Sequence, residues 1–388
     1  MHSCCWAYRG TGRRSRSALW CSSPSVPTVG KRVAMNSDQT TETTMTTLSR
    51  RSLRMSRSGT SRLSTSLRAL ALALCATAFA AHADVPLPAA AKARGATVEA
   101  KGPAPKHLRI AVLTYQGSSF WQQMEDGTQA AIAYLKPLNT DVVEVPLGTN
   151  LSAEVFDAGL DGVIAKQFNG AIGVPIFDGT VSKVNEAVDG GIPFYSVIAD
   201  SNAHSKRGVS MGMQAYDAGH AAGDFIAKQI GGEGKVVVIT GVLGAAQHDA
   251  RMNGAMDLWK KSYPKIKIIG PFESKDDAAT VYSQATDAIS GNPDLKVIYV
   301  TANGSEAAAK AVKDAKATGH IGVVGYDDLP EKAQYKQDGE ILALLDQAPY
   351  RQVFDAVVMM HNQLAFGAKY PSDIVIPSPV AYGKYAHH

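Results

Sequence analysis

Cysteine is missing from most of this sequence. The chain has 388 residues, and its four cysteines, Cys4, Cys5, Cys21 and Cys75, all lie in the N-terminal part. If export removes that part, as the features below indicate, the remaining chain can form no disulfide and offers no thiol for catalysis. Metal sites built on cysteine are then excluded as well.

Apolar runs long enough to cross a membrane are also missing. The run LALALCATAFAA, residues 70–81, is shorter than the roughly 20 residues that a membrane-spanning helix needs. Arg62 and Arg68 precede it and Ala81-His82-Ala83 follows it, which is the order of a cleavable export signal. We therefore expect a signal peptide at residues 55–83, cleavage after Ala83, and a soluble periplasmic product with no direct membrane insertion.

Residues 1–54 do not fit this signal, because export signals begin near the start of translation. Met55 would be a conventional start, so we interpret residues 1–54 as a mis-called or non-native extension. Two other interpretations of the apolar run fit less well. The Ser/Thr/Arg-rich chain before it could not supply the core for a buried helix, and Leu74 stands where lipid attachment at Cys75 would require a small residue.

An excess of positive charge is missing from the chain after the signal. Residues 1–83 contain twelve of the 39 Lys and Arg residues and only two of the 35 Asp and Glu residues, Asp38 and Glu42. From Asp84 onward 27 basic residues therefore face 33 acidic ones, a net charge of −6. A mildly acidic protein of this kind predicts no nucleic-acid partner and no anionic membrane partner.

Catalytic and cofactor motifs are missing too. The sequence has no G-x-S-x-G, no H-E-x-x-H, and no G-x-G-x-x-G after its first predicted strand. The segment GGEGKV at residues 231–236 resembles part of a phosphate-binding loop, but no Ser or Thr follows Lys235, so we interpret it as a turn. The ten histidines are scattered. We expect no enzyme activity, no cofactor and no metal site.

What the sequence does contain is a repeated strand-then-helix pattern. Short apolar runs predict strands at 109–114, 142–145, 162–165, 194–199, 236–240, 266–269, 296–301, 321–326 and 341–346. Helical spacing predicts helices at 119–136, 180–189, 249–262, 278–290, 305–317 and 350–365. Such repeats favour parallel sheets with helices on both faces, and the units are too many for one sheet. The fold is therefore predicted as α/β with two doubly wound lobes. Residues 84–106, rich in Ala, Pro and Lys, show no period and are predicted to be a flexible leader.

Ligand-recognising residue types stand at the carboxyl ends of the predicted strands, where open α/β sheets bind their ligands. Phe120 and Trp121 begin the first helix, and two adjacent large aromatics cannot both face the core, so at least one should be partly exposed in the cleft. Their rings could pack against the C–H faces of a sugar. Polar residues that can bind hydroxyl groups follow later strands. These are Asp200, Arg251, Asn303, Asp327 and Gln347. Each of them alone could instead cap a helix or a turn.

From Leu108 to Tyr382 the chain resembles the type I periplasmic substrate-binding proteins of bacterial sugar ABC transporters, the ribose-binding group. The resemblance rests on RIAVLTYQGSSFW, AYDAGHAAGDFIA, DARMNG, NPDLKVIYVTANG, VVGYDD and DQAPY in this order. It places an aromatic clamp at Phe120 and Trp121, and ligand hydrogen bonds at Asp200, Arg251, Asn303, Asp327 and Gln347.

The same resemblance implies a monomer whose lobes close on the ligand about three hinge crossings, near residues 213, 347 and 373. The first lobe would comprise residues 107–213 and 348–373, and the second residues 214–347 and 374–384. The closed form would deliver a small neutral sugar or polyol to the permease subunits of an ABC importer. Closure follows because a ligand that touches both lobes binds the closed state better.

Three departures from the ribose-binding pattern leave the identity of the sugar open. Ser118 and Ser119 stand where ribose binders have Asn-Pro, and Ser201 replaces the Arg that often follows the cleft Asp. Near Asp276-Asp277 the sequence has no counterpart of the aromatic residue that stacks from the second lobe in the family, and it does not decide whether these two aspartates reach the cleft. In addition, the segment at 165–179 looks longer than usual and could reshape the cleft.

Three other functions compete with transport. A repressor of the LacI type shares the fold but needs an N-terminal DNA-binding domain, where this chain has an export signal. An enzyme on the same scaffold would need a nucleophile–base pair or a metal set. A periplasmic subunit that passes its ligand to a chemoreceptor or a sensor kinase stays open as the alternative.

Overall fold

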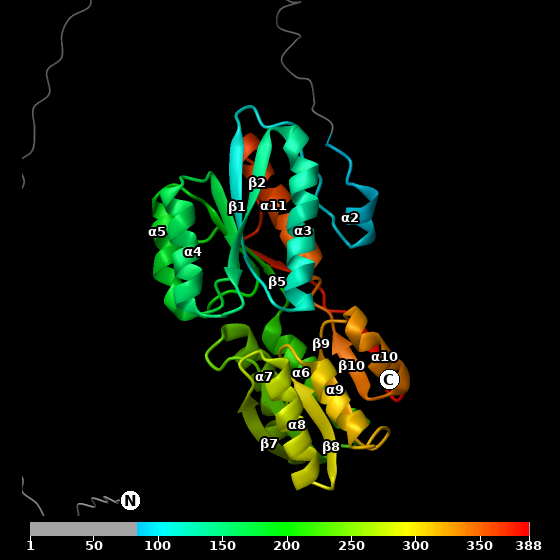
Figure 1. The fold of residues 1–388 in the computed structure, drawn as a ribbon. Helices are drawn as coiled ribbons and strands as arrows, with labels where there is room; N and C mark the ends of the chain where they lie inside the picture. The colour runs from blue at the N-terminus through cyan, green and yellow to red at the C-terminus, as the bar shows by residue number, and fades with distance from the viewer. Residues whose placement is uncertain (1–83, 388) are drawn as a thin grey trace, which may run out of the picture. The chain divides into compact units, whose positions relative to one another are not determined.

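The protein is described by a computed structural model that covers residues 84–387 (Figure 1). The predictions for residues 1–54 and 55–83, including cleavage after Ala83, lie outside the described residues. Within residues 84–387, no helix combines the length and the apolar character that crossing a membrane requires.

Two six-stranded sheets confirm the predicted two-lobed α/β fold, with strand orders β11-β5-β4-β3-β1-β2 and β12-β10-β9-β8-β6-β7. All neighbours pair in parallel except β10 and β12. The first sheet contains β1 (Leu108–Tyr115), β2 (Thr140–Gly148), β3 (Gly170–Gly173), β4 (Phe194–Ile198), β5 (Val209–Gly212) and β11 (Asp373–Val375). The second contains β6 (Glu233–Thr240), β7 (Lys265–Glu273), β8 (Leu295–Val300), β9 (Gly322–Tyr326), β10 (Ile341–Leu345) and β12 (Val380–Tyr382).

The helices follow the strands in the alternating order that the sequence predicts. In the first lobe they are α2 (Ala89–Ala93), α3 (Ser119–Leu135), α4 (Ala153–Ala165), α5 (Val181–Asp189) and α11 (Pro349–Phe366). In the second they are α6 (Ala215–Gln229), α7 (Ala246–Ser262), α8 (Ala278–Gly291), α9 (Ser305–Asp314) and α10 (Ala333–Asp338).

Each sheet is covered on both faces because its central strands are apolar on both sides. Along β1, Ile110 and Val112 pack with α3 and α11, whereas Ala111 and Leu113 pack with α4 and α5. Figure 1 shows these two helix pairs on opposite sides of the first sheet. The central strand of the second sheet, β6, alternates in the same way between the cluster of α6 and α7 and the cluster of α8 and α9.

The chain passes between the two sheets three times. The crossings follow β5, β10 and β11, so the first two lie after Gly212 and after Leu345. The third lies after Val375 rather than near 373, because β11 pairs with β5 along Asp373–Val375. Each crossing begins at the carboxyl end of its strand, which is the end where open α/β sheets bind their ligands.

The strand predicted at 162–165 is wrong, because these residues form the last turn of α4. Phe156, Leu160 and Val163 share one buried face of that helix. A short apolar run at the end of a helix cannot be distinguished from a strand by its periodicity alone. The true strand, β3, has the sequence GAIG and lies inside the segment 165–179 that looked unusually long.

Residues 84–106 are not the flexible leader that was predicted. Ala91, Ala96 and Ala100 are buried in the first lobe's core together with α3 and α11. The Asp355 carboxylate on α11 accepts hydrogen bonds from the Thr97 N–H (2.9 Å), the Thr97 hydroxyl (2.7 Å) and the Val98 N–H (3.1 Å). The packing depends on small side chains in one short helix, α2, and in irregular backbone, which are too brief to produce a helical or strand period in the sequence.

Candidate ligand-binding site

Six of the seven predicted site residues line one cavity, to which both lobes contribute. They are Phe120, Trp121, Arg251, Asn303, Asp327 and Gln347. Apolar side chains of the first lobe complete its walls, with Leu151, Val174, Ile176 and Ile198 among them. We call this the ring cavity. The carboxyl ends of strands in both sheets bring these residues together, which is why one rule about strand ends finds most of the site.

The aromatic pair forms the apolar wall. The side chain of Ser118 caps α3 by accepting from the Trp121 N–H (3.4 Å), which fixes the start of the helix. The Phe120 and Trp121 rings meet edge to face with centroids 4.9 Å apart, and Tyr115 supports Trp121 at 5.3 Å. Both residues are only 8% exposed, so neither protrudes as far as the sequence predicted. They offer the cavity a rigid aromatic surface instead.

Arg251 on α7 is the buried cation of the site, at 2% exposure. Its guanidinium lies over the Tyr326 ring at 4.0 Å and donates to the Thr301 carbonyl (3.1 Å) and to the Gln347 side-chain oxygen. Among the described residues, its Nε has no hydrogen-bond partner. An unpaired buried donor is costly, so this N–H is suited to bind an acceptor on a ligand.

Asp327 and Gln347 continue the polar wall from Arg251. The Gln347 amide donates to both Asp327 carboxylate oxygens, at 2.9 and 3.0 Å. Burial raises the pKa of Asp327 from 3.8 to about 6, while the positive charges of Lys332 and Arg251 oppose that rise. Asp327 also has a φ of 63°, a backbone conformation that non-glycine residues rarely adopt. Strain of this kind is typical of functional positions.

Asn303 and Asp276 form the next part of the wall. The Asn303 N–H donates to a carboxylate oxygen of Asp276 (3.1 Å), and both residues line the ring cavity. Asp277, by contrast, accepts from the N–H and the hydroxyl of Thr280, both at 2.7 Å, and so caps α8. Of the two aspartates that the sequence left open, Asp276 reaches the cleft and Asp277 does not.

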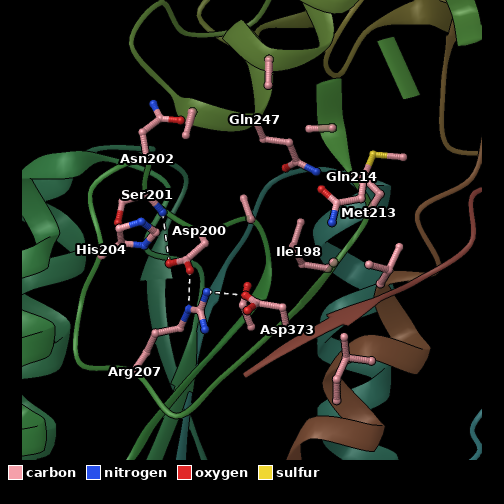
Figure 2. A pocket seen from close by; sticks show the side chains of 18 residues that line it. Ile198, Asp200, Ser201, Asn202, His204, Arg207, Met213, Gln214, Gln247 and Asp373 are labelled. Carbon is pink, nitrogen blue, oxygen red and sulfur yellow. Dashed lines mark hydrogen bonds and ion pairs between the residues drawn. The ribbon is translucent and has the colours of Figure 1, made fainter. Parts of the chain in front are cut away.

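Asp200 is the one predicted residue that the structure does not bring to the ring cavity. It lines a neighbouring cavity, where its carboxylate accepts from the Ser201 N–H (3.1 Å) and forms an ion pair with Arg207 (Figure 2). Arg207 also donates to the Ser372 carbonyl (2.7 Å) and to Asp373 (2.7 Å). These bonds tie Asp200 to the chain at β11 instead of pointing it at Arg251.

Among the other residues that line the ring cavity are two polar ones that the sequence analysis did not single out, Gln247 and His248 in the first turn of α7. Gln247 precedes Arg251 by four residues, so both lie on the same helix face, and this spacing could have revealed it. The Nδ1 of His248 accepts from the Val242 N–H (3.0 Å), and burial lowers the pKa of the imidazole, which keeps it neutral. Its neutral state leaves Arg251 as the cation of the cavity wall.

Comparison with known proteins finds sugar-binding proteins that are similar to this chain in sequence. The chain is 35% identical over 134 residues to the D-allose-binding periplasmic protein of Escherichia coli, which is 34% of this chain and 42% of the relative. It is 25% identical over 294 residues to the D-ribose/D-allose-binding protein of Pseudomonas aeruginosa, which is 71% of this chain and 88% of the relative. Some matches therefore span only about half of a curated relative's length.

Solved structures show the same fold. GanP, a glucose-galactose binding protein from Geobacillus stearothermophilus, superposes with a TM-score of 0.65 at 26% identity, over 71% of this chain and 98% of GanP. The sequence model of the family described as "Periplasmic binding protein domain" matches residues 110–369, well over half of the chain. The protein is therefore a member of the periplasmic binding protein domain family, as the resemblance predicted.

Proposed function

We propose that this protein is the solute-binding component of an ABC importer and that it binds a small neutral sugar or polyol in the ring cavity. The observation that carries the proposal is the pairing of an aromatic wall, Phe120 and Trp121, with a hydrogen-bonded chain of Arg251, Gln347 and Asp327. Carboxylates accept hydrogen bonds from hydroxyl groups, guanidinium groups donate them, and amides do both.

The charges of the wall favour a neutral ligand. One buried cation, Arg251, faces the carboxyl groups of Asp276 and Asp327, and His248 is neutral. An anionic ligand such as a uronate would meet more carboxylates than cations, whereas the hydroxyl groups of a neutral sugar can use both. The names of the relatives, which describe binding proteins for allose and ribose, support the same ligand class.

The lobes also touch each other beside the cavity. The Ala246 N–H of the second lobe donates to the Ile176 carbonyl of the first (3.1 Å), and the Ser119 hydroxyl donates to Glu331. In this arrangement the ring cavity has a volume of about 30 Å³, and Gln347 in its wall is hydrogen-bonded to Gln247, Arg251 and Asp327. A sugar therefore has to enter when the lobes are apart, and replaces some of these bonds when they close.

The rest of the proposed role follows from this ligand cycle. The protein works as a periplasmic monomer after cleavage behind Ala83, and its closed form docks on the permease subunits of the transporter. None of the relatives named above is described as an enzyme. Binding alone is therefore the proposed activity.

A thermal-shift screen of the chain from Asp84 onward tests the proposal. Monosaccharides, polyols and inositols are compared with uronates and amino acids at millimolar concentration. A ligand present at a hundred times its Kd stabilises the folded state by about 2.7 kcal/mol, which raises the melting temperature by a few degrees. A rise with neutral polyhydroxyl compounds alone supports the proposal, and a response to uronates or amino acids instead contradicts it.

A further inference from the structure

A second cavity lies beside the ring cavity, next to two of the hinge crossings (Figure 2). We call it the hinge cavity. Its volume is about 260 Å³, against about 30 Å³ for the ring cavity. The two cavities have two wall residues in common, Ile198 and Gln247. These two side chains therefore stand at the boundary between them.

The two boundary residues differ in how easily they can move. Ile198 ends β4 with a φ of 69°, and its N–H donates to the buried side chain of Gln352 (2.7 Å). A β-branched residue in this conformation is held by its surroundings, so Ile198 forms a fixed part of the wall. Gln247 has a longer, unbranched side chain, and its amide donates to the Gln347 oxygen in the wall of the ring cavity (2.8 Å). It is only 6% exposed.

The hinge cavity is built to hold polar groups. Asp200, Ser201 and Asn202 line it together (Figure 2). From α7 it is lined by the small side chains of Ala246 and Ala250 as well as by Gln247. The Asp200 carboxylate is already balanced by Arg207, so it can accept from a hydroxyl group without an unpaired buried charge. This is the residue that the sequence assigned to ligand binding and that the ring cavity lacks.

We propose that Gln247 is a specificity-determining residue that limits the ligand to a single sugar or polyol unit. With Ile198 it closes the ring cavity on the side of the hinge cavity. Shortening Gln247 joins the two cavities, and the joined space takes a second sugar unit beside Asp200. The inference rests on the proposed function, because it presumes that a sugar or polyol occupies the ring cavity.

The test compares Gln247→Ala with the wild-type protein, both expressed from the full chain and purified from the periplasm. Gln214→Ala is the matched control, since Gln214 lines the hinge cavity but not the ring cavity. Titration calorimetry against a panel of monosaccharides, polyols and disaccharides measures the affinities. Circular dichroism checks that each variant is folded.

We expect the wild type and Gln214→Ala to bind single-unit ligands and no disaccharide. Gln247→Ala should bind the single-unit ligand about tenfold more weakly, the effect of one lost hydrogen bond. It should also gain measurable affinity for a disaccharide, and adding Asp200→Asn should reduce that gained affinity about tenfold.

The other outcomes each give a distinct answer. Disaccharide binding by the wild type, or an unchanged ligand profile in Gln247→Ala, overturns the role of Gln247 and leaves the proposed function standing. If Gln247→Ala gains affinity for a disaccharide but adding Asp200→Asn does not reduce it, the second sugar unit does not lie beside Asp200. If no protein binds any member of the panel, the proposed function fails and the inference fails with it.

Discussion

Replacing Asp327 by Asn should make the ligand-free protein more stable while it weakens ligand binding. Burial raises the pKa of Asp327 from 3.8 to about 6. Between these values the folded state keeps a proton that the unfolded state has lost, so the free energy of unfolding falls as the pH rises from about 4 to 6. Above pH 6 this loss is complete.

The magnitude follows from the same pKa. A tenfold change in proton affinity is about 1.4 kcal/mol, so the ionised Asp327 reduces the stability of the folded state by about 3 kcal/mol at neutral pH. Asn cannot ionise and can still accept one hydrogen bond from Gln347, but its amide group needs a partner of its own. We therefore expect Asp327→Asn to gain about 1–3 kcal/mol at pH 7.5 and much less at pH 4.

Urea unfolding at pH 4 and pH 7.5 measures the gain. Asp328→Asn is the matched control, because Asp328 is an exposed carboxylate paired with Lys336, and such pairs contribute about 1 kcal/mol or less. The reasoning is refuted if Asp327→Asn is no more stable than the wild type at pH 7.5, or if its gain in stability is as large at pH 4. In either case the ionisation of the buried Asp327 does not reduce the stability of the folded state.

Ligand binding should respond in the opposite direction. Hydroxyl groups of a sugar stabilise the ionised form of Asp327, so the affinity of the wild type should decrease as the pH falls below about 6. Asp327→Asn should bind more weakly at pH 7.5 and should lack this pH dependence. Titration calorimetry at several pH values tests both points, and an unchanged affinity in the variant would remove Asp327 from the site.

Other changes test the remaining parts of the site and the fold. Arg251→Ala should lower ligand affinity at least about a hundredfold with an unchanged circular dichroism spectrum, since it removes charged hydrogen bonds of about 1.5–3 kcal/mol each; unchanged affinity in calorimetry would contradict its role. Trp121→Ala should weaken sugar binding and leave the pH dependence of the affinity nearly unchanged. An affinity equal to that of the wild type would show that the aromatic wall does not contact the ligand. Asp355→Ala should lower the melting temperature and speed amide exchange in residues 97–98, because three hydrogen bonds end on its carboxylate, and unchanged exchange would contradict that fastening.

Most of the fold could be predicted from the sequence because the strand-then-helix pattern repeats along the chain. Each central strand is apolar on both faces, so the runs around Ile110 and Val237 stand out against the polar turns between them. The pattern does not predict β3, because its sequence GAIG is too short and too rich in glycine to be recognised as a strand. The end of the preceding helix α4, GVIA, has the stronger apolar run and therefore resembles a strand more than β3 does.

The shared cavity could be anticipated for a different reason, since strand ends in parallel sheets meet at one edge. That rule selected Arg251, Asp327 and Gln347, which line the ring cavity, and Asp200, which follows β4 just as regularly but lines the hinge cavity. The deciding contact is the ion pair with Arg207, seven residues further on in a loop. Irregular loops have no period, so a side chain that redirects another from a loop cannot be inferred from spacing.

The segment at 84–106 has a consequence for the order in which the chain can fold as it is synthesised. Thr97 bonds to Asp355, 258 residues further along, so this contact cannot form until nearly the whole protein has been made. The strands β6 to β10 of the second sheet, by contrast, lie in one continuous stretch. The second lobe can therefore assemble most of its core while the first still waits for α11, and long-range closure of this kind is slow. Residues 84–106, which are synthesised before either sheet, are therefore among the last to pack.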